Sequence, residues 1–70
     1  MQLLLVEDDP EIARKLIREL DRAGHPCRWT ETVADGLAAL AERLPELVLL
    51  DLNLPDGSGF DFLREARRTS

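Results

Sequence analysis

The sequence predicts an α/β domain in which three short parallel strands alternate with three helices. Strand-like segments rich in apolar residues lie at 2–6, 25–30 and 47–50. The segments that follow them carry apolar residues three and four positions apart, a spacing typical of helices with one buried face. This alternation favours a parallel sheet built from right-handed crossover connections. With 70 residues, the chain forms one domain at most.

The first strand, 2–6, leads into an acidic run at 7–9. Asp9 followed by Pro10 predicts the start of a helix, because aspartate accepts hydrogen bonds from free backbone N–H groups and proline is tolerated at the first helical position. Gly24 is expected to end this helix, since glycine tolerates the left-handed conformation of a helix end. The apolar residues that mark the core-facing side of the helix are Ile12, Leu16, Leu20 and Ala23, flanked by Ala13 and Ile17.

The second strand, 25–30, is predicted to lie at a sheet edge, because its residues alternate in polarity and a proline suits its start. Thr32, with Asp35 three residues later, resembles a capping box and predicts the start of the second helix. Gly36 weakens this helix slightly, and Pro45 closes it. The apolar face of the helix is expected to consist of Val33, Leu37, Leu40, Ala41 and Leu44.

The third strand, 47–50, is wholly apolar and is therefore expected to be buried on both faces of the sheet. Asp51 follows directly and must lie at the carboxyl end of the strand, where open α/β sheets bind their ligands. Turn-forming residues at 54–59 are expected to bring the backbone over that crevice. Ser58 is expected to cap a third helix, whose last turns carry arginines that complement the helix dipole.

Three carboxylates from two strand ends are expected to converge. The carboxyl ends of neighbouring parallel strands lie about 4.8 Å apart, which would bring Glu7 and Asp8 next to Asp51. Such carboxylates repel each other unless a cation lies between them. Mg²⁺ suits the site, because it prefers oxygen ligands and is commonly held by one or two carboxylates together with phosphate oxygens. The residues therefore suggest phosphoryl transfer with Asp51 as the covalent nucleophile.

Acidic residues at strand ends can instead cap the next helix or face solvent. This simpler interpretation is favoured for Asp9, which directly precedes Pro10. For Glu7 and Asp8 taken alone, the two interpretations carry equal weight. Their combination with an isolated Asp51 after an apolar strand favours a functional site.

Composition and charge narrow the classes of function. The net charge of −5 argues against tight non-specific binding of nucleic acid by this segment. No apolar run approaches the roughly 18 residues that span a bilayer, and the amino terminus does not resemble a signal peptide, so no membrane partner is expected. The single cysteine, Cys27, cannot form an internal disulfide, which fits the reducing cytoplasm.

The motifs VEDD at 6–9 and LLDLNLPDGSG at 49–59, with the interval between them, resemble the amino-terminal part of a receiver domain from a two-component response regulator. The resemblance covers the whole chain. It implies a flavodoxin-like fold with three parallel strands in the order 2-1-3 and helices on both faces of the sheet. The motifs are also similar to the branch with a winged-helix DNA-binding domain, which implies a role in transcription and contact with DNA only through a domain outside this chain.

The resemblance implies a role for each site residue. Asp51 would be the phosphoacceptor, and its partner would be the phosphohistidine of a sensor histidine kinase. Asp8 would bind Mg²⁺ directly, Glu7 would act mainly through coordinated water, and the backbone carbonyl of Asn53 would supply a further metal ligand.

The chain departs from the family pattern at its carboxyl end. Receiver domains ordinarily have two more strands and two more helices, which bring a Ser or Thr and a Lys to the phosphoryl group. The one lysine here, Lys15, lies on the polar face of the first helix, and Thr69 and Ser70 come too early to supply that hydroxyl. Residues 1–70 are therefore expected to form a partial receiver domain with an unpaired strand edge, which either self-associates or belongs to a longer protein.

Three functions stay open from the sequence. The first is a signalling switch phosphorylated on Asp51, which is not an enzyme acting on external substrates. The second is an aspartyl-phosphate hydrolase, although Asn53 stands where such an enzyme needs a second aspartate as acid and base. The third is a binding or assembly module that keeps the receiver fold without being phosphorylated.

Overall fold

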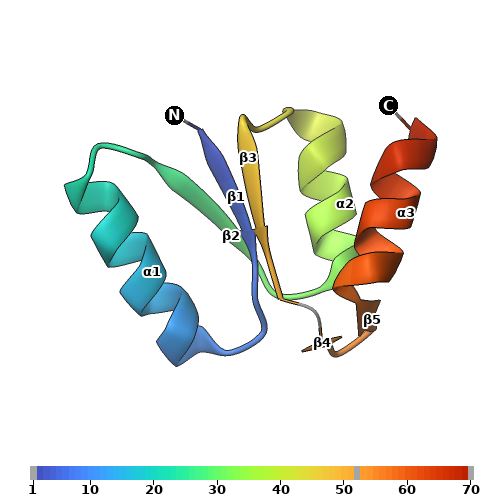
Figure 1. Ribbon diagram of the computed structural model, residues 1–70, viewed down its shortest axis with the longest axis horizontal. Coiled ribbons are helices and arrows are strands. Elements are labelled where there is room, and N and C mark those ends of the chain that lie inside the picture. Colours follow the sequence, from blue (N-terminus) through green and yellow to red (C-terminus); the bar gives the residue numbers. More distant parts are fainter. Residues whose placement is uncertain (1, 52, 70) are drawn as a thin grey trace.

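The computed structural model describes residues 2–51 and 53–69. In chain order, its elements are β1 (Leu3–Val6), α1 (Pro10–Arg22), β2 (Cys27–Thr30), α2 (Val33–Glu42), β3 (Leu47–Leu50), β4 (Asn53–Leu54), β5 (Gly57–Ser58) and α3 (Gly59–Thr69). The helices cover both faces of the main sheet, with α1 on one side and α2 and α3 on the other (Figure 1). The predicted alternation of three strands with three helices is confirmed.

β1 is the central strand of a parallel sheet with the order β2-β1-β3, as the resemblance implies. In the register of the sheet, Leu5 faces Trp29 of β2 and Leu49 of β3. Every residue of β1 is at most 4% exposed, because strands flank it on both sides and helices cover both its faces. β2 lies at one edge of the sheet, which confirms the predicted edge strand.

β3 lies at the other edge, and the expectation that both its faces are buried is wrong. Leu47 is 49% exposed, and the remaining residues of β3 are only partly buried. The physical reason is that β3 pairs with β1 alone among the strands in 2–51 and 53–69, and that the helices lie more closely over β1 and β2 than over β3. A wholly apolar run therefore identified the strand but not its place in the sheet.

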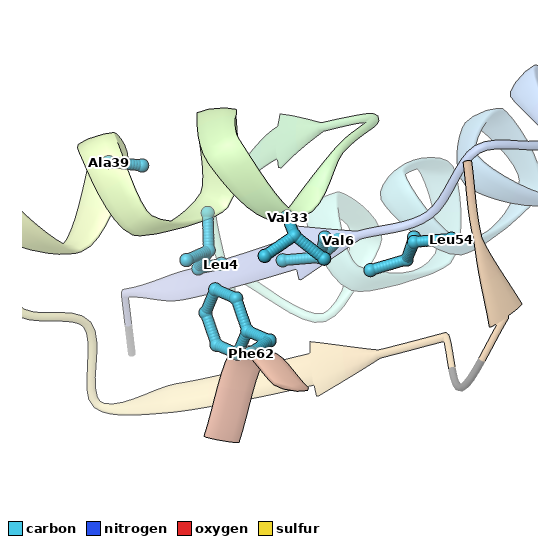
Figure 2. Packing of buried hydrophobic residues seen from close by; sticks show 6 residues of the cluster. All are labelled: Leu4, Val6, Val33, Ala39, Leu54 and Phe62. Carbon is cyan, nitrogen blue, oxygen red and sulfur yellow. The ribbon is translucent and has the colours of Figure 1, made fainter. Parts of the chain in front are cut away.

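The core lies between the sheet and the two helices α2 and α3 (Figure 2). Phe62 of α3 is 1% exposed and lies beside side chains from β1 and α2. The buried cluster consists of Leu4, Val6, Val33, Ala39, Leu54 and Phe62. α2 ends at Glu42, so the expectation that Leu44 lies on its apolar face is wrong: Leu44 follows the helix and is 79% exposed, and Ala41 is exposed as well.

The buried stripe of α1 is shifted by one residue from the predicted one. Ala13 is fully buried, and Ile17 and Leu20 are partly buried. Ile12 is 46% exposed and Leu16 is 38% exposed. The prediction is therefore right in that α1 packs on the sheet through an apolar side, and wrong in assigning Ile12, Leu16 and Ala23 to that side.

The predicted helix ends are confirmed. Asp9 Oδ1 accepts a hydrogen bond from the backbone N–H of Glu11 at 2.9 Å, at the start of α1. The hydroxyls of Thr32 and Ser58 each accept from the N–H three residues later, at 3.0 and 3.2 Å. Gly24, just after α1, has a φ of 83°, the left-handed conformation expected there.

The loop after β3 contains a small antiparallel hairpin that the sequence did not predict. Asn53 pairs with Ser58, and Leu54 pairs with Gly57. The turn predicted for this region thus lies between two short strands, β4 and β5, and leads directly into α3.

Candidate metal site at the carboxyl edge of the sheet

The structure brings together the three carboxylates expected to converge. β1 and β3 run in parallel with Val6 opposite Leu50, so the carboxyl ends of both strands lie at the same end of the sheet (Figure 1). The backbone N–H of Asp51 continues this pairing by donating to the carbonyl of Val6 at 2.9 Å. As a result, one oxygen from each of Glu7, Asp8 and Asp51 lies within 4.8 Å of the other two.

The electrostatics of this cluster favour a cation. Partial burial raises the pKa of the Glu7 carboxyl above its usual value, and the carboxylates of Asp51 and Asp8 raise it further. The N–H of Asp9, which donates to Glu7 Oε2 at 3.2 Å, opposes this rise. Three clustered carboxylates present hard oxygen ligands, which is the donor set that Mg²⁺ prefers. The residues present therefore fit a divalent cation of this class.

The backbone of Glu7 is held from β2. The N–H of Glu7 donates to the carbonyl of Thr30 at 3.0 Å, and the indole Nε1–H of Trp29 donates to the carbonyl of Glu7 at 2.9 Å. Asp8, the next residue, is exposed. The cluster thus combines a partly buried residue, whose backbone is held from β2, with an exposed one.

The loop after Asp51 is attached to the start of α2. The carboxylate of Asp56 accepts hydrogen bonds from the backbone N–H groups of Val33 at 2.7 Å and Ala34 at 3.0 Å. The sequence analysis treated Asp56 only as a turn residue. The sequence does indicate that α2 needs a further acceptor. The first N–H groups of a helix need partners, and the side chain of Thr32 accepts a hydrogen bond from only one of them.

Asn53, the other predicted ligand residue, lies two positions beyond Asp51 at the start of β4. Its pairing with Ser58 holds the backbone of this segment next to the amino end of α3. The structure thus places Asn53 in the first strand of the hairpin that follows Asp51.

Comparison with known proteins gives the family. Residues 3–70 match the response regulator receiver domain. The chain belongs to this family. Among curated relatives of this receiver domain, the KDP operon transcriptional regulatory protein KdpE of Escherichia coli is 43% identical over 68 residues, which is 97% of this chain. The chain spans 30% of the length of KdpE.

Solved structures show the same receiver fold. The MaeR response regulator bound to beryllium trifluoride matches with a TM-score of 0.88 and 42% identity, over 99% of this chain and 58% of that one. The complex of histidine kinase ThkA with response regulator protein TrrA contains a match with a TM-score of 0.91 and 29% identity, over 99% of this chain and 60% of that one. In this receiver domain, none of the helices within 2–51 and 53–69 combines the length and apolar character of a membrane span.

Proposed function

We propose that this receiver domain is a phosphorylation-dependent signalling switch in which Asp51 accepts a phosphoryl group from the phosphohistidine of a sensor histidine kinase. The observation that carries the proposal is the position of Asp51 at the end of β3, with Glu7 and Asp8 within 4.8 Å. Membership of the receiver family supports it, as does the similarity to a regulator solved in complex with a histidine kinase.

The proposed step is a transfer of one phosphoryl group. A carboxylate oxygen of Asp51 attacks the phosphorus, and an acyl phosphate bond forms as the P–N bond to the histidine breaks. The electron pair of the broken bond stays on the imidazole nitrogen of the kinase. The hydrogen bond from the backbone N–H of Asp51 to the carbonyl of Val6 keeps the nucleophile at the carboxyl end of the sheet during the transfer.

Glu7, Asp8 and Asp51, with the backbone carbonyl of Asn53, are the groups that would hold Mg²⁺. When bound, Mg²⁺ neutralises charge on the transferring phosphoryl oxygens. The raised pKa of Glu7 is consistent with this assignment: partial burial is its main cause, and the neighbouring carboxylates of Asp51 and Asp8 add a repulsion that a cation would relieve.

The proposal is tested by incubating the chain with Mg²⁺ and acetyl phosphate and measuring the intact mass. We expect a gain of one phosphoryl group that disappears in Asp51→Asn and on addition of a chelator. Asp35→Asn, which removes an exposed aspartate on α2, is the matched control and should still be phosphorylated. Steady release of phosphate at enzymatic rates, or no gain of mass in the wild type, would contradict the proposal.

The name of KdpE points to transcriptional regulation. We propose the same output for the whole protein to which this receiver belongs. Contact with DNA would then belong to residues outside this chain, since the net charge of −5 disfavours DNA binding by the receiver itself.

A further inference from the structure

We propose that Trp29 is a positioning residue for the cation site and acts through the backbone of Glu7. The proposal rests on the proposed function, because it assumes that Glu7 and Asp8 serve as ligand residues. The indole Nε1–H of Trp29 donates to the carbonyl oxygen of Glu7 at 2.9 Å, in a partly buried contact between residues 22 positions apart.

This bond lies just beyond the regular pairing of the sheet. The paired residues of β1 and β2 end at Val6 and Thr30. Glu7 is one residue further on, and its N–H still donates to the carbonyl of Thr30 at 3.0 Å. The indole adds a second bond on the carbonyl side of the same residue. Glu7 is therefore held from β2 at both its backbone N–H and its carbonyl.

Holding that carbonyl orients both ligand residues. The carbonyl of Glu7 and the N–H of Asp8 belong to one peptide unit, which is planar and includes the Cα atoms of both residues. Fixing this plane fixes the points from which the two carboxylates project. Because these carboxylates and that of Asp51 repel each other, an unrestrained segment would tend to move them apart. The indole bond opposes that movement before a cation arrives.

Trp29 is well placed to do this. Its register partner in β1 is Leu5, so both side chains lie on the same face of the sheet, which is opposite to the face shared by Val6 and Thr30. The side chain of Trp29 is half-buried. Its N–H reaches past the end of β1 to the carbonyl of Glu7.

The test is the affinity for Mg²⁺, measured by following amide chemical shifts in NMR titrations of folded protein. Trp29→Phe keeps an aromatic ring and removes the N–H. We expect it to weaken Mg²⁺ binding about three- to tenfold, which is the range for one net hydrogen bond. At saturating Mg²⁺ the rate of phosphorylation by acetyl phosphate should return to the wild-type value, a recovery that a general structural defect would not give.

Thr30→Val is the matched control on the same strand. It removes a partly buried side-chain hydrogen bond, from Thr30 Oγ1 to the carbonyl of Leu5 at 3.4 Å, but leaves the carbonyl of Glu7 bonded. Its Mg²⁺ affinity should stay within about twofold of the wild type. An equal loss of affinity in Thr30→Val and Trp29→Phe would overturn the proposal.

The experiment distinguishes a failure of the Trp29 role from a failure of the proposed function. Should Trp29→Phe fail to fold, the indole can be replaced by a benzothiophene of the same shape in a synthetic chain, which exchanges the N–H for sulfur. Unchanged Mg²⁺ affinity in that chain, or in folded Trp29→Phe, overturns the role of Trp29 alone. A wild-type chain that binds no Mg²⁺ overturns the proposed function together with this inference.

Discussion

The carboxylate of Asp56 joins the loop after Asp51 to the start of α2. Hydrogen bonds from the backbone N–H groups of Ala34 and Val33 hold the pKa of Asp56 below its usual value, because they favour the charged form of the carboxyl. The first N–H groups of a helix also carry partial positive charge, which acts in the same direction. Asp56 therefore fastens the loop to α2 most strongly when it is ionised.

We expect Asp56→Asn to lower the free energy of unfolding at pH 7 and to make it less dependent on pH. The pKa of Asp56 is lower in the folded state, so its ionised form stabilises the fold fully above about pH 4, the ordinary value for aspartate. This contribution is lost as the pH falls through the depressed value. Urea unfolding from pH 7 down to pH 3 should therefore show wild type and variant converging on acidification.

The control for this experiment is Asp35→Asn, which removes another exposed carboxylate from the first turn of α2. We expect it to keep most of the pH dependence of the wild type. A gap between wild type and Asp56→Asn that stays constant down to pH 3 would show that the hydrogen bonds of Asp56 are not linked to its ionisation.

At the level of single residues, the sequence predicts which side chains meet at the carboxyl ends of neighbouring strands. It does not predict hydrogen bonds that depend on how helices and strands pack against each other. The proximity of Asp51 and Asp8 could be predicted, because apolar runs mark where neighbouring parallel strands end. The hydrogen bond from the indole of Trp29 to the carbonyl of Glu7, and the one from the N–H of Val33 in α2 to the carboxylate of Asp56, link residues more than 20 positions apart. They depend on register and helix placement, which no local pattern encodes.

Among the elements, α2 and α3 approach each other closely at Gly36. A Cβ atom at this position would lie 2.8 Å from Phe62 Cε2, a distance that real Cβ atoms essentially never show, and 3.0 Å from Val6 Cγ2, which is tighter than most real contacts. Phe62 and Val6 are themselves fully buried. The sequence suggests only that Gly36 weakens the helix, whereas in the structure it makes room for the core.

We expect Gly36→Ala to lower the free energy of unfolding by about 1 kcal/mol. Alanine stabilises a helix relative to glycine by about 1 kcal/mol, but overpacking a core costs about 1–3 kcal/mol, and the Phe62 ring that would have to move is buried. Thermal or urea unfolding measures the difference. Ala38→Gly, on the exposed side of α2, calibrates helix propensity alone and should also destabilise by about 1 kcal/mol. A Gly36→Ala chain as stable as the wild type would contradict this prediction, because it would mean that α3 moves away from α2 without loss of free energy.

The apolar pattern of α1 does not by itself determine which face of the helix is buried. α1 has two neighbouring apolar stripes, one through Ile12 and Leu16 and the other through Ala13 and Ile17, and both have helical spacing. The structure buries the stripe that begins with Ala13, whose small side chain allows close contact, and leaves Ile12 half exposed. Caps such as that of Asp9 could be predicted, because their hydrogen bonds join residues within one turn.

At the scale of the whole molecule, the described chain is compact but has incompletely covered apolar surface. Its radius of gyration is 11.4 Å, close to the value of about 11 Å for a folded chain of this length. Yet Leu47 on β3 and Phe60 on α3 are 49% and 63% exposed. The residues of β3 are uncharged, whereas the opposite edge strand, β2, carries Arg28 in an ion pair with Glu42. β3 is therefore the edge that is less protected against pairing with another chain.

We expect the 70-residue chain to self-associate through β3, and Leu47→Lys to shift it toward the monomer. A lysine on an edge strand opposes pairing, because a charged side chain would have to be buried against the incoming strand. Leu44→Lys is the control: Leu44 is 79% exposed but lies in the connection before β3, so the same change there should leave association nearly intact. Light scattering over a range of concentrations measures both. A wild-type chain that stays a compact monomer at every concentration would rule out association, and equal effects of the two substitutions would place it at a surface other than the β3 edge.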